Sequence, residues 1–150
     1  MCVCSLIGIG FCGGKVAMNR LPGWEPESWG YHGDDGNAFC SHGPGKSYGP
    51  QFAANDVIGC GVNFNNRSAF FTKNGVHLGI PTNPEGRRIN ADGPMFLDTA
   101  FREIKGGKLY PAVGMKRLGE HVRVNFGQEE FVYDIVSHMK VCCDCASWIR

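Results

Sequence analysis

The chain has 150 residues, a length that suits one domain with its own hydrophobic core and is short for two. Its 15 basic and 14 acidic side chains give a formal charge of +1, so binding to nucleic acid or to a membrane through bulk charge is not indicated. The 22 glycines and 8 prolines favour short strands joined by tight turns over long helices.

The N-terminal stretch MCVCSLIGIGFC is apolar, but it contains no basic residue and is too short to span a membrane. We therefore expect a soluble protein from a reducing compartment, without a membrane partner. Residues 8–13 match the pattern G-x-G-x-x-G, but the turn at 21–23 leaves no room for the helix that would bind a pyrophosphate. Residues 45–47 imitate the end of a phosphate-binding loop, but Cys40 stands where that loop needs a glycine.

Alternation of apolar and polar residues predicts two strands, and turn signals delimit further strand candidates. In 121–126, for example, Val122, Val124 and Phe126 share one face, and 56–64 repeats the pattern. Asn74-Gly75 predicts a hairpin turn, because both residues tolerate positive φ. The predicted strands are 7–11, 28–32, 37–40, 56–64, 68–73, 76–78, 109–115 and 121–126. Such frequent short strands indicate an all-β fold, specifically a β-sandwich.

Two sets of residues raise the question of chemistry. We expect Cys12, Cys40 and Cys60, which lie singly among apolar residues, to be free buried thiols. The terminal cysteines, Cys2, Cys4, Cys142, Cys143 and Cys145, match zinc-ligand spacings poorly, so no metal or other cofactor is predicted.

An acid–base cluster of His32, Asp34 and Asp35, or a thiol pair of Cys40 and His42, would be the basis of an enzyme. Neither group has a third residue to orient it, and polar residues beside glycines are also what a tight turn needs. The sequence therefore predicts no catalytic residues.

Five blocks of the sequence carry a resemblance: NRLPGWEPESWGYHGDDGNAFC, YGPQFAANDVIGCGVNF, AFFTKNGVHLG, KLYPAVGM and VRVNFGQEEFVYDI. Together they resemble the SPRY domain of the Ran-binding protein M family, which includes scaffold subunits of the GID/CTLH ubiquitin ligase. The resemblance runs from about residue 7 to 135 and omits 80–98. It implies a bent antiparallel β-sandwich, the concanavalin-like jelly roll, and a non-catalytic function.

The resemblance also implies a binding surface made by loops at one edge of the sandwich, which would hold a partner peptide or protein. The positions expected on it are Asn19, Arg20, Leu21, Pro22, Tyr31, Phe39, Lys116, Arg117, Leu118 and Gly119. Subunits of a GID/CTLH-type ligase are further expected partners, in the cytoplasm and the nucleus. The tryptophans of the W-G-Y region are expected mainly to anchor loops.

The chain departs from the family pattern in three places: an atypical N-terminal extension, 1–6, an insertion at 80–98 inside the SPRY domain of 7–135, and an atypical tail, 136–150. An open sheet edge is one expected consequence. We hypothesise that these segments reflect an incomplete or mis-spliced gene model, which continuous transcript coverage through them would refute. Two alternatives to a binding module stay open: a passive scaffold domain, or a non-functional fragment of a longer protein.

Overall fold

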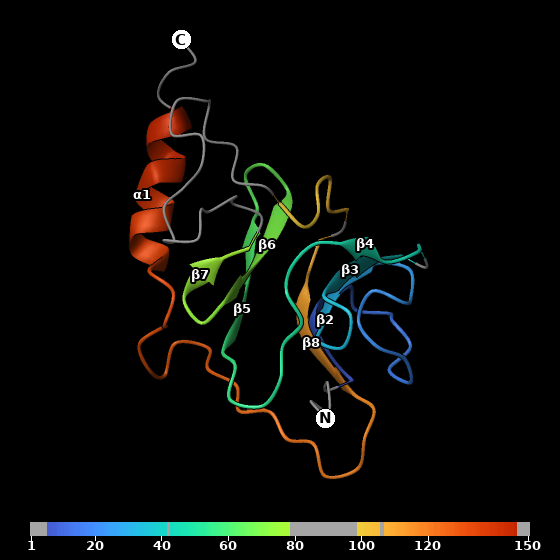
Figure 1. The fold of residues 1–150 in the computed structure, drawn as a ribbon. Helices are drawn as coiled ribbons and strands as arrows, with labels where there is room; N and C mark the ends of the chain where they lie inside the picture. The colour runs from blue at the N-terminus through green and yellow to red at the C-terminus, as the bar shows by residue number, and fades with distance from the viewer. Residues whose placement is uncertain (1–5, 42, 79–98, 106, 147–150) are drawn as a thin grey trace.

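The computed structural model describes residues 6–41, 43–78, 99–105 and 107–146. They form two antiparallel sheets and one helix (Figure 1). The five-stranded sheet has the order β4-β3-β2-β1-β8, and the three-stranded sheet has the order β5-β6-β7. Their strands are β1 (Ile7–Cys12), β2 (Ser28–His32), β3 (Asn37–Cys40), β4 (Lys46–Ser47), β5 (Ile58–Asn63), β6 (Ser68–Lys73), β7 (Val76–His77) and β8 (Tyr110–Met115). The predicted all-β sandwich is confirmed.

The core lies between the sheets and is mainly aromatic. Phe11 and Trp29 stack with ring centroids 5.1 Å apart, and the ring of Phe71 lies 5.4 Å from that of Tyr31 on the opposite sheet. Both Tyr31 and Phe71 are fully buried. Neighbouring residues of a strand point to opposite faces, so every second residue of β1, β2 and β6 contributes to this core. The strand alternation in the sequence thus becomes one shared hydrophobic layer.

The hairpin between β6 and β7 forms as predicted. Asn74 and Gly75 have φ angles of 50° and 79°, the left-handed conformation that this two-residue turn requires. The Asn74 side chain also joins the turn to the segment before β5, because its Oδ1 accepts the N–H of Val57 at 2.7 Å. Its Nδ2 donates to Asp56 Oδ1 at 2.8 Å. The asparagine thus fixes both the turn and its neighbour.

The prediction of a strand at 121–126 is wrong. Among the described residues this segment pairs with no other strand, and Val124 and Phe126 are 52% and 65% exposed. Local polar contacts hold the chain in a turn instead: Asn125 Oδ1 accepts the N–H of Gly127 at 2.9 Å, and Arg123 forms an ion pair with Glu129. Alternation creates a face that can be buried, but a strand also needs a neighbouring edge.

The helix α1 (Ile135–Ala146) packs on the outer face of the three-stranded sheet, on the side away from the five-stranded sheet (Figure 1). Its His138 ring stacks on Phe70 of β6 at 4.6 Å and lies 5.6 Å from His77 of β7. Asp134 caps the helix by accepting the N–H of Ser137 at 2.9 Å. The helix begins where the resemblance to the SPRY domain ends. The insertion predicted at 80–98 and the extension 1–6, apart from residue 6, lie outside the described residues.

Candidate functional site

The segment between β1 and β2 crosses the outer face of the five-stranded sheet, and glycines on that face make room for it. A Cβ atom on Gly30 of β2 would lie 2.3 Å from the Pro22 oxygen, and one on Gly114 of β8 would lie 2.6 Å from Leu21 Cδ2. The segment is also tied down by polar contacts, since the N–H of Gly23 donates to Ser28 Oγ at 2.7 Å. The glycine positions of these strands, which carry no side chain, thus fix the path of residues 21–23 across the sheet.

Three rings pack together beside this crossing. The His32 ring stacks on Phe39 with centroids 4.2 Å apart. Its Nε2 lies 2.8 Å from the Pro22 carbonyl oxygen, which can only accept, so Nε2 donates this hydrogen bond. Trp24 packs edge-on against both rings, at 5.4 Å from His32 and 6.2 Å from Phe39. One side of the Trp24 ring is therefore supported by the sheet, and the residue remains half-buried.

Two cations from different loops lie over the Trp24 ring. Arg20 Cζ is 5.7 Å from the ring centroid, and Lys116 Nζ is 5.3 Å from it, both within the range of cation–π attraction. The second loop is fixed by Glu120, whose Oε2 accepts the N–H groups of Lys116 and Arg117 at 3.1 and 3.0 Å. Loops that are far apart in the sequence thus meet at one tryptophan.

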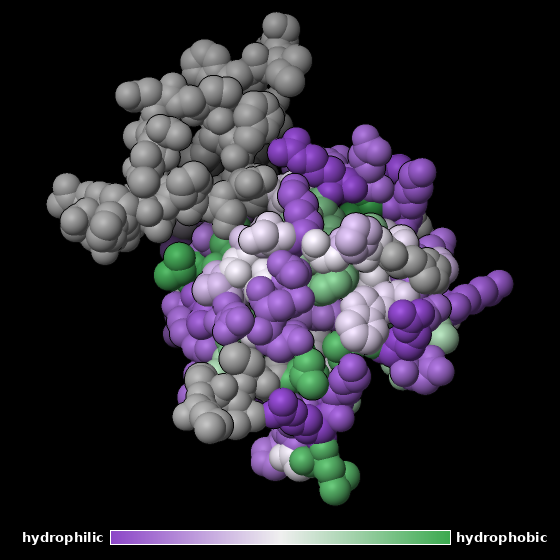
Figure 2. All heavy atoms as spheres, turned by 45° about the vertical axis from the view of Figure 1, so that its right-hand side comes forward, coloured by the Kyte–Doolittle hydropathy of each residue, from purple (hydrophilic) through white to green (hydrophobic). Residues whose placement is uncertain are grey.

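We call this site the Trp24 surface: Trp24 with Arg20, Phe39 and Lys116, and the adjoining Asn19, Arg117, Leu118 and Gly119. Of the positions predicted for a binding surface, Asn19, Arg20, Lys116, Arg117, Leu118 and Gly119 are exposed, and Phe39 is half-buried. Figure 2 shows the face that comes forward as mostly hydrophilic, with small, separate hydrophobic areas. A partner here would meet charged side chains around one aromatic ring, together with the fully exposed Leu118 side chain.

Three of the predicted positions need correction. The Tyr31 side chain points into the core and is fully buried, because on β2 it lies on the face opposite to that of His32. Leu21 and Pro22 are also buried, since they pack directly on the sheet. These three buried residues support the loops of the surface but cannot supply contact area to a partner.

Trp24 itself was missing from the predicted surface. The resemblance implied that the tryptophans anchor loops, and Trp29 does lie in the core at 5% exposure. The sequence context distinguishes the half-buried tryptophan from the buried one. Trp29 lies inside a strand, whereas Trp24 follows the turn Leu21-Pro22-Gly23 and precedes Pro26. A tryptophan in a proline-rich loop is held near the surface, where its ring can take part in binding.

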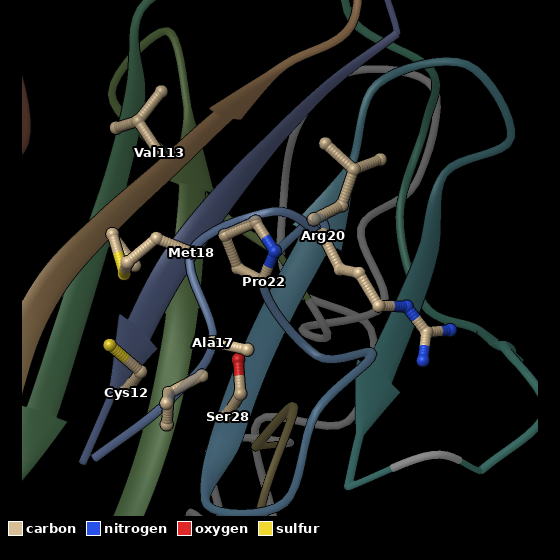
Figure 3. Close-up of a pocket in the computed structure, with 10 residues that line it drawn as sticks. Cys12, Ala17, Met18, Arg20, Pro22, Ser28 and Val113 are labelled. Carbon is tan, nitrogen blue, oxygen red and sulfur yellow. The ribbon is translucent and has the colours of Figure 1, made fainter. Parts of the chain in front are cut away.

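A small pocket adjoins the Trp24 surface, between the first loop and strands β1 and β8 (Figure 3). Its lining includes Cys12, Met18, Ser28 and Val113, and Arg20 borders it with a side chain that extends away from it. Its volume is about 30 Å³, whereas sites for small organic ligands usually measure about 300–1,000 Å³. This pocket has room for about one methyl-sized group and is too small for a ligand of that size.

Two of the residues that could have suggested an enzyme, His32 and Asp35, have structural roles. His32 is 1% exposed, and Asp35 accepts two hydrogen bonds from Asn37 that close the turn before β3. Burial raises the pKa of the Cys12 thiol, which keeps it protonated and unreactive near neutral pH. Cys12 is a free buried thiol as predicted, but Cys40 and Cys60 are exposed, which corrects the expectation for both.

Within the part of the chain that the structure describes, no three His, Cys, Asp or Glu side chains are grouped closely enough to hold a metal ion. His42 and the cysteines at 2 and 4 lie outside that part, and so do the side chains of Cys142, Cys143 and Cys145. Also among the described residues, no helix is long and apolar enough to cross a membrane.

His32 should make the fold sensitive to acid. Burial lowers the pKa of this imidazole below 6.5, although its hydrogen bond to Pro22 opposes the shift. The folded chain therefore binds this proton less readily than the unfolded chain, and stability should fall as the pH drops through about 6.5. We expect the free energy of unfolding, measured in urea between pH 7.5 and 5, to fall more steeply for the native chain than for His32→Gln. Equal slopes would contradict this role.

Comparison with known proteins agrees with this geometry. Residues 5–129 match the SPRY domain. The chain belongs to the SPRY domain family. A crystal structure of a human SPRY domain matches with a TM-score of 0.61 and 29% identity, over 86% of this chain and 72% of that one.

Similar proteins are Ran-binding proteins, as the sequence resemblance predicted. The chain is 50% identical over 135 residues to the Ran-binding proteins 9/10 homolog of Drosophila melanogaster, and 47% identical over 134 residues to human Ran-binding protein 9. It is 38% identical over 130 residues to the Ran-binding protein M homolog of Arabidopsis thaliana. These matches cover 89%, 89% and 86% of the chain, but only 12%, 16% and 23% of the relatives. SPRY domains and these relatives are generally non-catalytic interaction modules.

Proposed function

We propose that this SPRY domain binds a partner peptide or protein on the Trp24 surface. The observation that carries the proposal is the meeting of Arg20 and Lys116, from separate loops, over one tryptophan ring. Tryptophan and arginine are the residue types most often found to dominate binding energy at interfaces. The exposed side chains of Arg20, Lys116 and Arg117 suit a partner that binds and dissociates, because such interfaces are about as polar as ordinary protein surface.

The proposed function is recognition without catalysis. The support for this is the burial of His32, the turn-closing role of Asp35 and the methyl-sized volume of the neighbouring pocket. The near-zero formal charge of the chain argues against nucleic acid or membrane as the main partner.

We further propose that the partner is recruited to a scaffold of the GID/CTLH type of ubiquitin ligase, in the cytoplasm and the nucleus. The support is the resemblance to the Ran-binding protein M family. The names of the relatives make Ran a partner to test directly. This chain corresponds to less than a quarter of each of these relatives, so the role proposed for it is display of the partner, and assembly of a ligase is left to the parts of the relatives that it does not match.

The proposal is tested by panning a peptide library on the immobilised chain and titrating the enriched peptides calorimetrically. Loss of both cations, in Arg20→Ala/Lys116→Ala, should weaken binding at least about tenfold, or about 1.4 kcal/mol. Arg102→Ala/Lys105→Ala is the matched control, because both residues are exposed, have the same types and lie in the connection before β8. Peptides that bind all three chains equally would contradict the proposal and favour a passive scaffold domain.

A further inference from the structure

The free chain already places its own carboxylates on the positive groups of the Trp24 surface. Glu25 Oε1 lies 3.1 Å from Arg20 Nη1, in an ion pair whose side chains are 18% and 47% exposed. Glu120 Oε2 binds the backbone N–H groups of Lys116 and Arg117. Carboxylates are thus the groups that both loops bind in the absence of a partner.

The two carboxylates differ in what they do. Glu120 fixes the turn at 116–119 through backbone groups, and so it is part of the support of the loop. Glu25 instead pairs with the side chain of Arg20, which is nearly half exposed and can turn toward a partner. Both side chains of this ion pair keep contact with solvent, so the pair is weak and an incoming carboxylate can replace it.

We propose that the Trp24 surface recognises an acidic segment of its partner, and that Glu25 competes with that segment for Arg20. The proposal rests on the binding function proposed above and defines its chemistry. In the free chain the Glu25 carboxylate is paired with the Arg20 guanidinium. In the complex a partner carboxylate replaces Glu25 in this ion pair, and Lys116 and Arg117 contribute further positive charge to the surface. The part of the half-buried Trp24 side chain that stays exposed offers an apolar contact to a side chain between the acidic residues. Glu25 thereby restricts binding to segments with enough negative charge to displace it.

The first test is the composition of the enriched library peptides. Aspartate and glutamate should be enriched over their frequency in the library, and replacing them by asparagine and glutamine in one enriched peptide should weaken binding at least about tenfold. Binding should also weaken as salt rises from 50 to 300 mM, because exposed charges are screened. Enriched peptides that depend on Arg20 and Lys116 but carry no acidic residue would overturn the proposal of an acidic segment and would leave the proposed binding function unaffected.

A second class of occupant is tested in the same assay. A single-stranded oligonucleotide that binds as tightly as the peptide, and that loses binding in Arg20→Ala/Lys116→Ala, would overturn the proposal that the occupant is a peptide.

The second test isolates Glu25. Glu25→Gln frees Arg20 and should tighten binding of the same acidic peptide roughly two- to fivefold, the value of an exposed ion pair. Glu27→Gln is the matched control, because it changes the charge of the same loop equally and is exposed, and the described part of the chain shows no ion pair for it. Its affinity should stay within error of that of the native chain. Equal tightening by both variants, or none by Glu25→Gln, would overturn the role of Glu25. Thermal melts of both variants check that the loop remains folded.

Discussion

Replacing Phe71 by alanine should unfold much of the population under mildly denaturing conditions. The Phe71 ring is fully buried, and its centroid lies 5.4, 6.0 and 6.2 Å from the ring centroids of Tyr31, Tyr48 and Phe101. Loss of this ring therefore leaves a cavity where the two sheets meet. Truncations of this kind cost about 3–5 kcal/mol, a large part of a typical total of about 5–15 kcal/mol. Urea denaturation followed by circular dichroism measures the change.

Phe126→Ala is the matched control for this prediction. The same ring is removed, but Phe126 is 65% exposed in the turn after 121–125, so the expected change is below about 1 kcal/mol. A cost above about 2 kcal/mol would show that residue 126 is packed in the native state, as the sequence pattern had predicted. Equal costs for both variants would contradict the core described here.

Replacing Trp24 by alanine should remove most partner binding. The variant loses the ring beneath both cations, and truncation of a central interface tryptophan typically costs about 2–4 kcal/mol, or roughly 30- to 1,000-fold in Kd. The measurement is calorimetric titration with an enriched library peptide.

Because Trp24 also packs on His32 and Phe39, the alanine variant should lose some stability. Trp24→Phe separates the two effects, since a smaller ring keeps the packing and part of the cation–π attraction. It should therefore bind with intermediate affinity. Native affinity in the fully folded alanine variant would contradict the central place of Trp24.

The sandwich could be predicted from the sequence because its strands obey a local rule. The polar connection at 65–67 and the Asn-Gly turn suffice to delimit β6 and the start of β7, and β2 and β3 begin and end at the predicted residues. The segment 121–126 obeys the same alternation and is no strand, because pairing depends on a neighbour that no local pattern reports. Helix α1 was not predicted, since its docking relies on ring contacts of His138 with Phe70 and His77, which lie far away in the sequence.

The site could be predicted in part. The resemblance identified the two loops, and the exposed ends of both loops, Arg20 and Lys116, do meet. The resemblance gave a wrong position for the Tyr31 side chain, because the direction in which a strand side chain points depends on which face of the sheet is buried. Glu25 could not be identified as a competitor from the sequence, since only the folded loop brings its carboxylate to Arg20.

The central claim is that a partner binds on the Trp24 surface, and an NMR titration tests it most directly. The chain, labelled with ¹⁵N, would be titrated with the most enriched library peptide while its backbone and tryptophan indole signals are recorded. The largest shifts are expected at the Trp24 indole N–H and at the backbone amides of 19–21, 23–24 and 116–119. Shifts confined to α1 and the outer face of the three-stranded sheet, with the Trp24 indole unchanged, would contradict the claim.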